Sequence, residues 1–157
     1  MATQKSPMDM INQLSMGQKL IAVGGIALLI FSFLPWHHYS FGAISGIPGV
    51  PGSLNRNAWQ SPDAIWSILA VLIGLIMALV VLSKLANVDL PDLGSVTWGQ
   101  AMLGAAAAVL ILVIIKFIAH SGSLGVGFFL GFIAAVVIAA GGYMLYTEER
   151  GGQGIRS

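Results

Sequence analysis

Three histidines have the clearest capacity for chemistry in this sequence. His37 and His38 directly follow a long apolar segment, and His120 ends another. Neutral imidazoles bind zinc, copper or haem iron, and a facing pair can ligate the magnesium of a chlorophyll. Asp63, which starts a further apolar segment, adds a carboxylate. We therefore take His37, His38 and His120 as candidate cofactor-binding residues.

A simpler interpretation of the histidines competes with this one. Histidines beside Trp36 and Tyr39 can sit at the headgroup depth of a membrane without binding anything. Adjacent histidines rarely reach one metal ion, and the sequence has neither a C-x-x-C-H nor an H-E-x-x-H motif. We predict no metal site, and the identity of any cofactor stays open.

The sequence lacks the motifs of most other catalytic and binding sites. There is no cysteine, which excludes disulfides, thiolate metal sites and cysteine nucleophiles. There is no Gly-x-Ser-x-Gly motif, phosphate-binding loop or pair of carboxylates within an apolar segment. The net charge of +1 gives no reason to expect nucleic-acid binding. We therefore expect a protein that is not an enzyme.

The composition indicates that lipid surrounds most of the chain. Hydrophobic residues make up 57% and charged residues only 8%, whereas soluble domains carry about a quarter charged residues. A spanning helix needs about 20 apolar residues. Four segments qualify, at 17–34, 62–85, 98–119 and 124–146. The sequence predicts an all-α membrane protein, a four-transmembrane-helix bundle.

The remaining segments are assigned around this membrane domain, which covers residues 17–147. Residues 1–16 are expected to form a short cytoplasmic segment on the membrane surface, with one apolar helix face. Residues 35–61 form an outer loop rich in Pro and Gly, and residues 148–157 form a flexible cytoplasmic tail. Capping boxes are predicted at Ser15 with Gln18 and at Thr97 with Gln100, and an N-cap at Ser61 before Pro62.

The distribution of Lys and Arg predicts the orientation. With both termini in the cytoplasm, most cations lie on the cytoplasmic side of the membrane. Arg56 and Lys116 oppose this pattern. Because Lys116 lies about one turn from the end of its segment, we expect its side chain to extend to the headgroups.

The first and third apolar segments resemble each other. Residues 15–22 align with residues 97–104 at an offset of 82, and His38 then aligns with His120. This indicates two αα-hairpins repeated in parallel about an axis along the membrane normal. The alternative is that two capped apolar helices converged on a similar composition.

Small residues at four-residue spacing predict where helices approach closely, either within this chain or against another chain. The candidate packing positions are Ala70, Gly74, Ala78, Gly104, Ala108, Gly127, Gly131, Ala135 and Ala139.

Several short motifs carry a family resemblance: Gln18-Lys19-Leu20-Ile21, Leu34-Pro35-Trp36 within residues 31–36, Asn57-Ala58-Trp59 and Thr97-Trp98-Gly99-Gln100. In these the chain resembles the uncharacterised four-helix (tetraspan) bacterial membrane proteins of the actinobacterial type, with a Leu-Pro-Trp turn after the first span. The resemblance implies this topology in the inner (plasma) membrane of a bacterium, but no activity. The pair His37-His38 departs from the small or aromatic residues expected after that Trp.

The sequence favours a non-catalytic integral membrane protein, an accessory or structural subunit that packs in a larger membrane complex. Its expected partners are the lipid bilayer and other membrane subunits or copies of itself. One alternative is a cofactor- or metal-binding subunit of the haem or chlorophyll type that uses His37, His38 and His120. A second alternative is a small channel or transporter formed by an oligomer.

Overall fold

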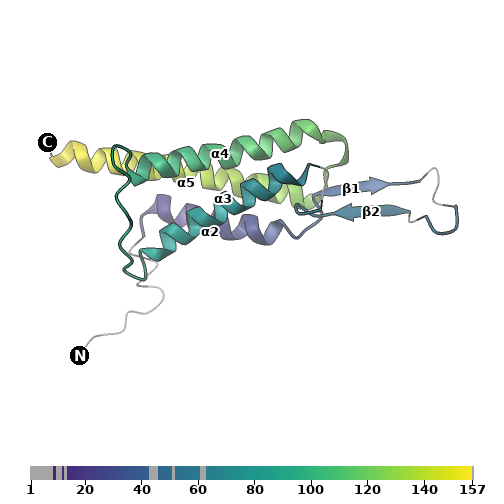
Figure 1. Ribbon diagram of the computed structural model, residues 1–157, viewed down its shortest axis with the longest axis horizontal. Coiled ribbons are helices and arrows are strands. Elements are labelled where there is room, and N and C mark those ends of the chain that lie inside the picture. Colours follow the sequence, from purple (N-terminus) through teal and green to yellow (C-terminus); the bar gives the residue numbers. More distant parts are fainter. Residues whose placement is uncertain are drawn as a thin grey trace, which may run out of the picture.

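Four helices form a bundle, and a β-hairpin extends from one end of it in the computed structural model (Figure 1). The structure describes residues 9, 12, 14–42, 46–50, 52–60 and 63–156. The helices are α2 (Met16–Phe31), α3 (Ala64–Ser83), α4 (Trp98–Ala119) and α5 (Val126–Arg156), and a short 3-10 helix η1 (Ser121–Ser123) joins the last two. The prediction of an all-α helical bundle is confirmed.

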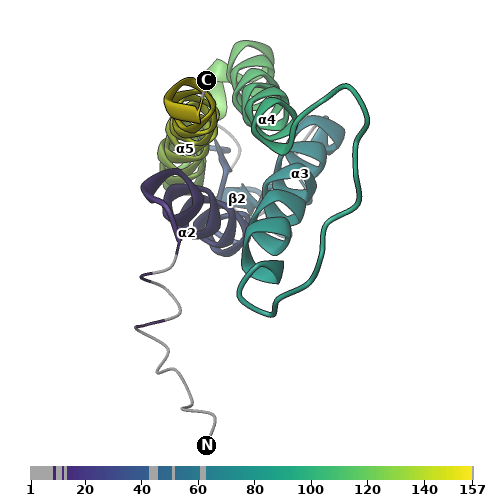
Figure 2. The ribbon, with the colours of Figure 1, turned by 90° about the vertical axis from the view of Figure 1, so that its left-hand side faces the viewer.

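The helices are arranged as a closed ring. Each helix packs against two others, so that α2 lies between α3 and α5, and α4 lies diagonally opposite α2 (Figure 2). Two parallel αα-hairpins would produce this arrangement, with α2–α3 and α4–α5 as the repeated units. The connections after α2 and α4 differ, because a β-hairpin follows α2 and only a short turn follows α4.

Helices α2 and α4 begin in the same way, as the capping motifs predict. The backbone N–H of Gln18 donates to Ser15 Oγ at 3.2 Å, and the backbone N–H of Ser15 donates to Gln18 Oε1 at 3.0 Å. Thr97 and Gln100 repeat both bonds, at 3.2 and 3.1 Å. Both predicted capping boxes are confirmed, and they satisfy N–H groups that a helix start leaves unpaired.

Helix α3 begins differently. The predicted cap at Ser61 and Pro62 lies outside the described residues. The N-cap is Asp63, whose φ of 50° and ψ of 42° place it in the left-handed region, and its side chain makes no capping hydrogen bond. This conformation is uncommon for a residue other than glycine and is worth a functional explanation.

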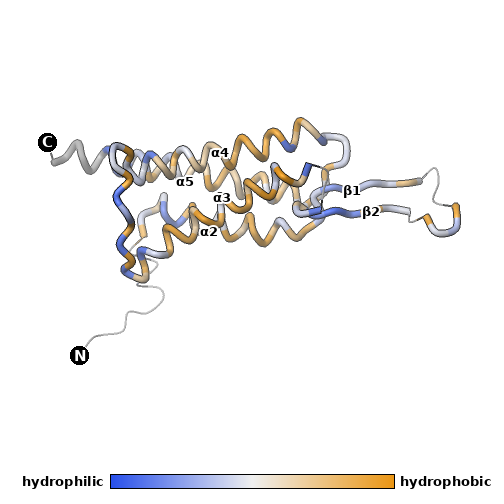
Figure 3. The backbone as a smooth tube through the Cα atoms, in the orientation of Figure 1, coloured by the Kyte–Doolittle hydropathy of each residue, from blue (hydrophilic) through white to orange (hydrophobic). Residues whose placement is uncertain are grey.

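Within the described part of the chain, three helices are long and apolar enough to cross a membrane by length and composition: Ala64–Ser83, Trp98–Ala119 and Val126–Arg150. Helix α2 has only 16 residues and spans roughly 24 Å, which is less than the roughly 30 Å of hydrocarbon in a bilayer. Pro35 has no N–H to donate to Phe31 O, which accepts instead from the N–H of Leu34 at 3.1 Å, so the helix does not continue. The chain is an integral membrane protein whose apolar helices contact lipid (Figure 3).

The predicted outer loop contains a sheet. Strands β1 (His37–Ser40) and β2 (Ser53–Arg56) pair antiparallel, with His37 opposite Arg56 and Ser40 opposite Ser53. The hairpin projects away from the helices along the bundle axis (Figure 1). We call this end of the bundle the hairpin end, and the end where α2 and α4 begin the N-cap end.

The terminal segments were predicted as a surface segment and a flexible tail. Most of residues 1–16 lie outside the described residues, including the Met10 and Ile11 of the expected apolar face. The prediction for residues 148–157 is wrong in part, because α5 continues as a helix to Arg156. Glu148 and Glu149 are held in place at the N-cap end, as described below, which favours continuation of the helix.

Most of the predicted packing positions lie inside the bundle. Ala70, Ala78 and Ala135 are fully buried, and Ala139 is half-buried. At Gly74, Gly127 and Gly131 an added Cβ would press on other side chains or on the backbone of residues 34–35. Gly104 differs, because an added Cβ there would meet nothing within 4 Å. Ala108, one turn further along α4, is half-buried.

Candidate functional site

Polar side chains from three elements gather at the hairpin end. His37 and Tyr39 come from β1, Lys116 and His120 from the end of α4, and Asp63 from the start of α3. We call these five residues the hairpin-end cluster. It contains two of the three predicted histidines.

The backbone around Trp36 fixes the position of His37. The N–H of Trp36 donates to Arg56 O at 2.9 Å, and its carbonyl accepts from the N–H of Gly125 at 2.7 Å. The fully buried Trp36 ring donates through Nε1 to Phe31 O at 2.8 Å. Strand β1 is therefore tied to β2, to the end of α2 and to the start of α5.

His37 is fully buried, and only one of its two ring nitrogens has a hydrogen-bond partner. Its Nδ1 lies 3.0 Å from Ser123 Oγ, whereas its Nε2 is buried without a hydrogen-bond partner. Burial of the ring, followed by the nearby charges of Lys116 and His120, lowers the pKa of His37 to about 4. The side chain is therefore neutral at physiological pH.

His120 contacts His37 directly. The two ring centroids lie 5.5 Å apart, with the ring planes at 78°. On one side, His120 Nε2 lies 3.6 Å from Asp63 Oδ2, and on the other side its Nδ1 is buried without a partner. The left-handed conformation of Asp63 accompanies this contact. Because 57% of the Asp63 side chain and 23% of the His120 side chain are exposed, this pair forms the solvent-facing side of the cluster.

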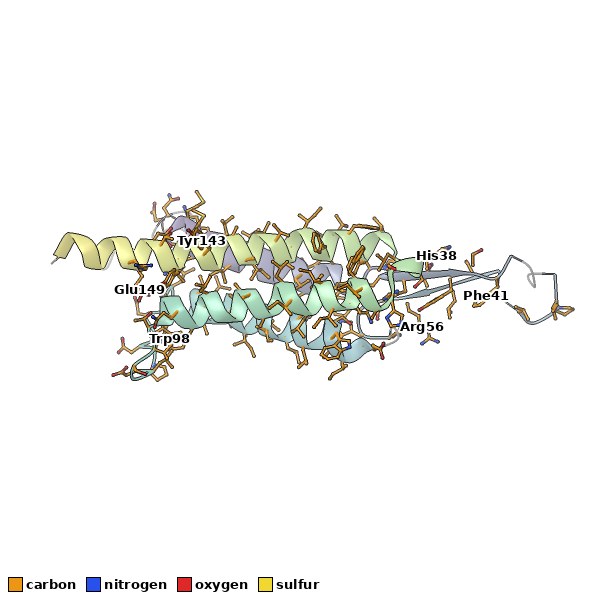
Figure 4. All side chains as sticks on the ribbon, turned by 90° about the horizontal axis from the view of Figure 1, so that it is seen from above. His38, Phe41, Arg56, Trp98, Tyr143 and Glu149 are labelled. Atoms are coloured by element: carbon orange, nitrogen blue, oxygen red, sulfur yellow. The ribbon has the colours of Figure 1, made fainter. Side chains whose placement is uncertain are left out.

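His38 does not join the other two histidines. Successive side chains of a strand point to opposite faces, so His38 points away from His37 and is exposed. Figure 4 shows His38 at the base of the hairpin. Its Nδ1 lies 2.6 Å from Asn55 Oδ1 on the neighbouring strand. The 82-residue offset paired His38 with His120, but the structure brings His37 to His120 instead.

Lys116 is the residue that the sequence reasoning misplaced. The prediction that it extends to the headgroups is wrong, because its side chain is fully buried inside the protein. It continues the buried face of α4, which also contains Val109 and Val113 at helical spacing. That spacing was visible in the sequence. Buried ionisable groups at membrane depth face the bundle interior and mark functional sites by default.

The cluster leaves three buried polar atoms without partners in the described structure: His37 Nε2, His120 Nδ1 and the Tyr39 hydroxyl. The rings that carry them are in contact, since His37 stacks on Tyr39 with centroids 6.2 Å apart. An unsatisfied buried polar group costs about 1–3 kcal/mol. The described residues include no group of three or more His, Asp or Glu side chains that could hold a metal ion.

A second polar arrangement lies at the N-cap end and was also missed. Glu148 Oε1 accepts from the backbone N–H of Gly17 at 3.3 Å, and Glu149 Oε2 accepts from that of Gly99 at 2.8 Å. Adjacent residues of α5 therefore cap the starts of two different helices. Figure 4 shows Glu149 near the start of α4. From the sequence alone, both residues were assigned to the expected tail, because their partners lie far away along the chain.

In comparisons with known proteins, no family model matches this chain, and no match was found among curated proteins or solved structures. Interpretation of function therefore depends on the residues and geometry of this chain alone.

Proposed function

We propose that this chain is a non-catalytic accessory subunit that packs against another membrane helix through the outward face of α4. The observation that carries the proposal is the environment of Gly104. Among the glycines of α2, α3, α4 and α5 as far as Gly142, it is the only one whose added Cβ would meet nothing within 4 Å. Every other glycine in this set is already used for close packing within the chain.

The residues around Gly104 make a surface that suits helix association. Ala107 is exposed, Ala108 is half-buried, and Ile111 is 55% exposed. In lipid, burial of apolar surface does not drive helices together, whereas small residues allow close backbone approach and extensive van der Waals contact. Gly104 and Ala108 have the small-xxx-small spacing of such contacts. The face defined by Gly104, Ala107, Ala108 and Ile111 is therefore the α4 docking face.

The proposed topology places all four helices across the inner membrane of a bacterium, with both termini in the cytoplasm. The bias of Lys and Arg toward one side supports this orientation. Helix α2 is short, but the exposed Phe33 extends its apolar surface beyond Phe31. Local thinning of the bilayer can accommodate the remaining difference between the length of α2 and the hydrocarbon thickness at a modest free-energy cost. Membership of the four-helix bacterial group is part of the same proposal.

Co-purification from native membranes in a mild detergent tests the subunit role. We expect a partner membrane protein in fixed proportion with the unmodified chain, and its loss with Gly104→Leu. Ala140→Leu is the matched control, because it enlarges an exposed small residue on α5 and should retain the partner. If Gly104→Leu retains the partner, or if no membrane protein co-purifies with the unmodified chain, the proposal is wrong.

A cofactor-binding role keeps one supporting observation, the contact between His37 and His120 with an unpartnered nitrogen on each ring. His38 no longer supports it. Absorbance and metal analysis of the purified protein decide this alternative, since a colourless and metal-free preparation would exclude haem, chlorophyll and transition metals.

A further inference from the structure

A groove lies between α2 and α3 toward the N-cap end of the bundle, with a volume of about 200 Å³. Its walls include Lys19, Ala22, Val23 and Ile26 of α2, and Leu82 and Leu85 at and just beyond the end of α3. We call it the α2–α3 groove. Every lining side chain except Lys19 is apolar. Because Val23 is 64% and Ile26 42% exposed, the groove opens to the outside of the bundle, where lipid surrounds the helices.

The α2–α3 groove has one charged end and one apolar end. Lys19 lies in the first turn of α2, and the lining residues of this helix extend from there to Ile26, a rise of about 10 Å. Helix α3, which is long and apolar enough to cross a membrane, ends at Ser83 beside the same groove. The end of a spanning helix lies at the boundary with the headgroups. Lys19 is therefore at headgroup depth, and Val23 and Ile26 lie deeper in the hydrocarbon.

The position of Lys19 is not explained by contacts within the chain. A cation near the start of a helix is disfavoured by the helix dipole, and the first turn of α2 contains no acidic residue to offset it. No carboxylate of a described residue forms an ion pair with Lys19. Glu148, which lies at the same end, accepts instead from the backbone N–H of Gly17. An external anionic group at Lys19 would compensate for this unfavourable placement.

A phospholipid has its charge and its apolar chains in the same order along the bilayer normal as this groove. Basic sites between membrane helices recognise acidic headgroups. The volume of the groove is below the roughly 300–1,000 Å³ of pockets for drug-sized ligands, so it suits a stretch of one acyl chain. A neighbouring helix fits less well, because close helix approach favours small residues and Val23 and Ile26 are branched and exposed.

We propose that the α2–α3 groove binds one anionic phospholipid, with its phosphate at Lys19 and one acyl chain along Val23 and Ile26. The site is separate from the α4 docking face, since α4 lies diagonally opposite α2 (Figure 2). The lipid site and the subunit role can therefore fail independently.

Native mass spectrometry tests the headgroup preference. The purified chain in detergent is mixed with equal amounts of phosphatidylglycerol and phosphatidylcholine that carry identical oleoyl chains. We expect retention of one phosphatidylglycerol per chain in preference to phosphatidylcholine. Lys19→Gln should reduce this preference about fivefold, the contribution of one cation near an anionic lipid. Arg150→Gln removes the same charge from an exposed residue of α5 at the same end and should retain the preference. Equal retention of both lipids by the unmodified chain, or equal losses in the two variants, would overturn the proposal.

Photolabelling tests the position of the acyl chain. The unmodified protein is reconstituted in phosphatidylcholine vesicles with a small share of phosphatidylglycerol that carries a photoreactive group in the middle of one chain. We expect the label on residues 22–26 of α2 or on Leu82. Excess unlabelled phosphatidylglycerol should remove it, whereas inorganic phosphate, which has the charge without the chain, should not. Labelling spread evenly over α3, α4 and α5, or a cross-link between two copies of α2, would contradict the site.

Discussion

The two ends of the bundle differ in whether their polar groups have hydrogen-bond partners. At the N-cap end, Ser15 and Thr97 close two capping boxes, and Glu148 and Glu149 each bind a further N–H group. At the hairpin end, His37 Nε2 and two other buried polar atoms have no partner in the described structure. Satisfied groups stabilise a fold, whereas unsatisfied groups persist where a ligand or a function compensates for them. The polar groups of the N-cap end therefore add to stability, whereas those of the hairpin end are kept at a cost to it.

The largest effect is expected from removing the anchor of the hairpin end. Trp36→Ala deletes a fully buried ring, its hydrogen bond to Phe31 O and its edge contact with Phe128, so we expect a loss of about 3–5 kcal/mol. Trp98→Ala at the N-cap end is the matched control, because that ring is only half-buried. Denaturation of both variants in detergent measures the difference. Equal losses would contradict the assignment of Trp36 as the anchor.

The second-largest effect is expected from acidification, which should destabilise the hairpin end. Burial holds the pKa of His37 at about 4 against about 6.5 when unfolded, so the unfolded state binds more protons between these values. Stability therefore falls as the pH drops from about 6.5 toward 4, by up to about 3 kcal/mol. His37→Phe should remove this component of the pH dependence, and the exposed His38→Phe should retain it. An unchanged pH profile in His37→Phe would show that another group is responsible.

The smallest expected effect comes from one cap at the N-cap end. Glu149→Ala leaves the N–H of Gly99 without its acceptor and should cost about 1–2 kcal/mol. Glu148→Ala should cost less, because its bond to Gly17 is longer, 3.3 Å against 2.8 Å. Chemical denaturation of the two variants shows which of them loses more stability. The reverse order would mean that bond length does not rank the two caps.

Local sequence patterns predicted the features that depend on neighbouring residues. The apolar runs predicted the helices, and the capping boxes at Ser15 and Thr97 depend on residues only three positions apart. The end of α2 is also local, since Pro35 determines it. The prediction placed that end three residues late, because hydrophobicity continues through Leu34 after the helical conformation has stopped.

Contacts between distant residues were beyond such reasoning. Glu149 meets Gly99 across 50 residues, and His37 meets Ser123 across 86. The β-hairpin was missed because its strands are four residues each and are set in a Gly- and Pro-rich segment. Without the hairpin, nothing in the sequence separated the buried His37 from the exposed His38. Lys116 was misplaced because its charge was given more weight than its helical spacing from Val109 and Val113.

The paired caps of α5 have a consequence for assembly during synthesis. Helices α2 and α4 leave the ribosome before Glu148 and Glu149 exist, so the N–H groups of Gly17 and Gly99 must find water or lipid headgroups in the meantime. When α5 packs against the bundle, both N–H groups gain an acceptor together, because the two acceptors belong to consecutive residues. A chain truncated before Glu148 would contain every apolar segment and still lack the two bonds that fasten α2 and α4 to α5 at the N-cap end.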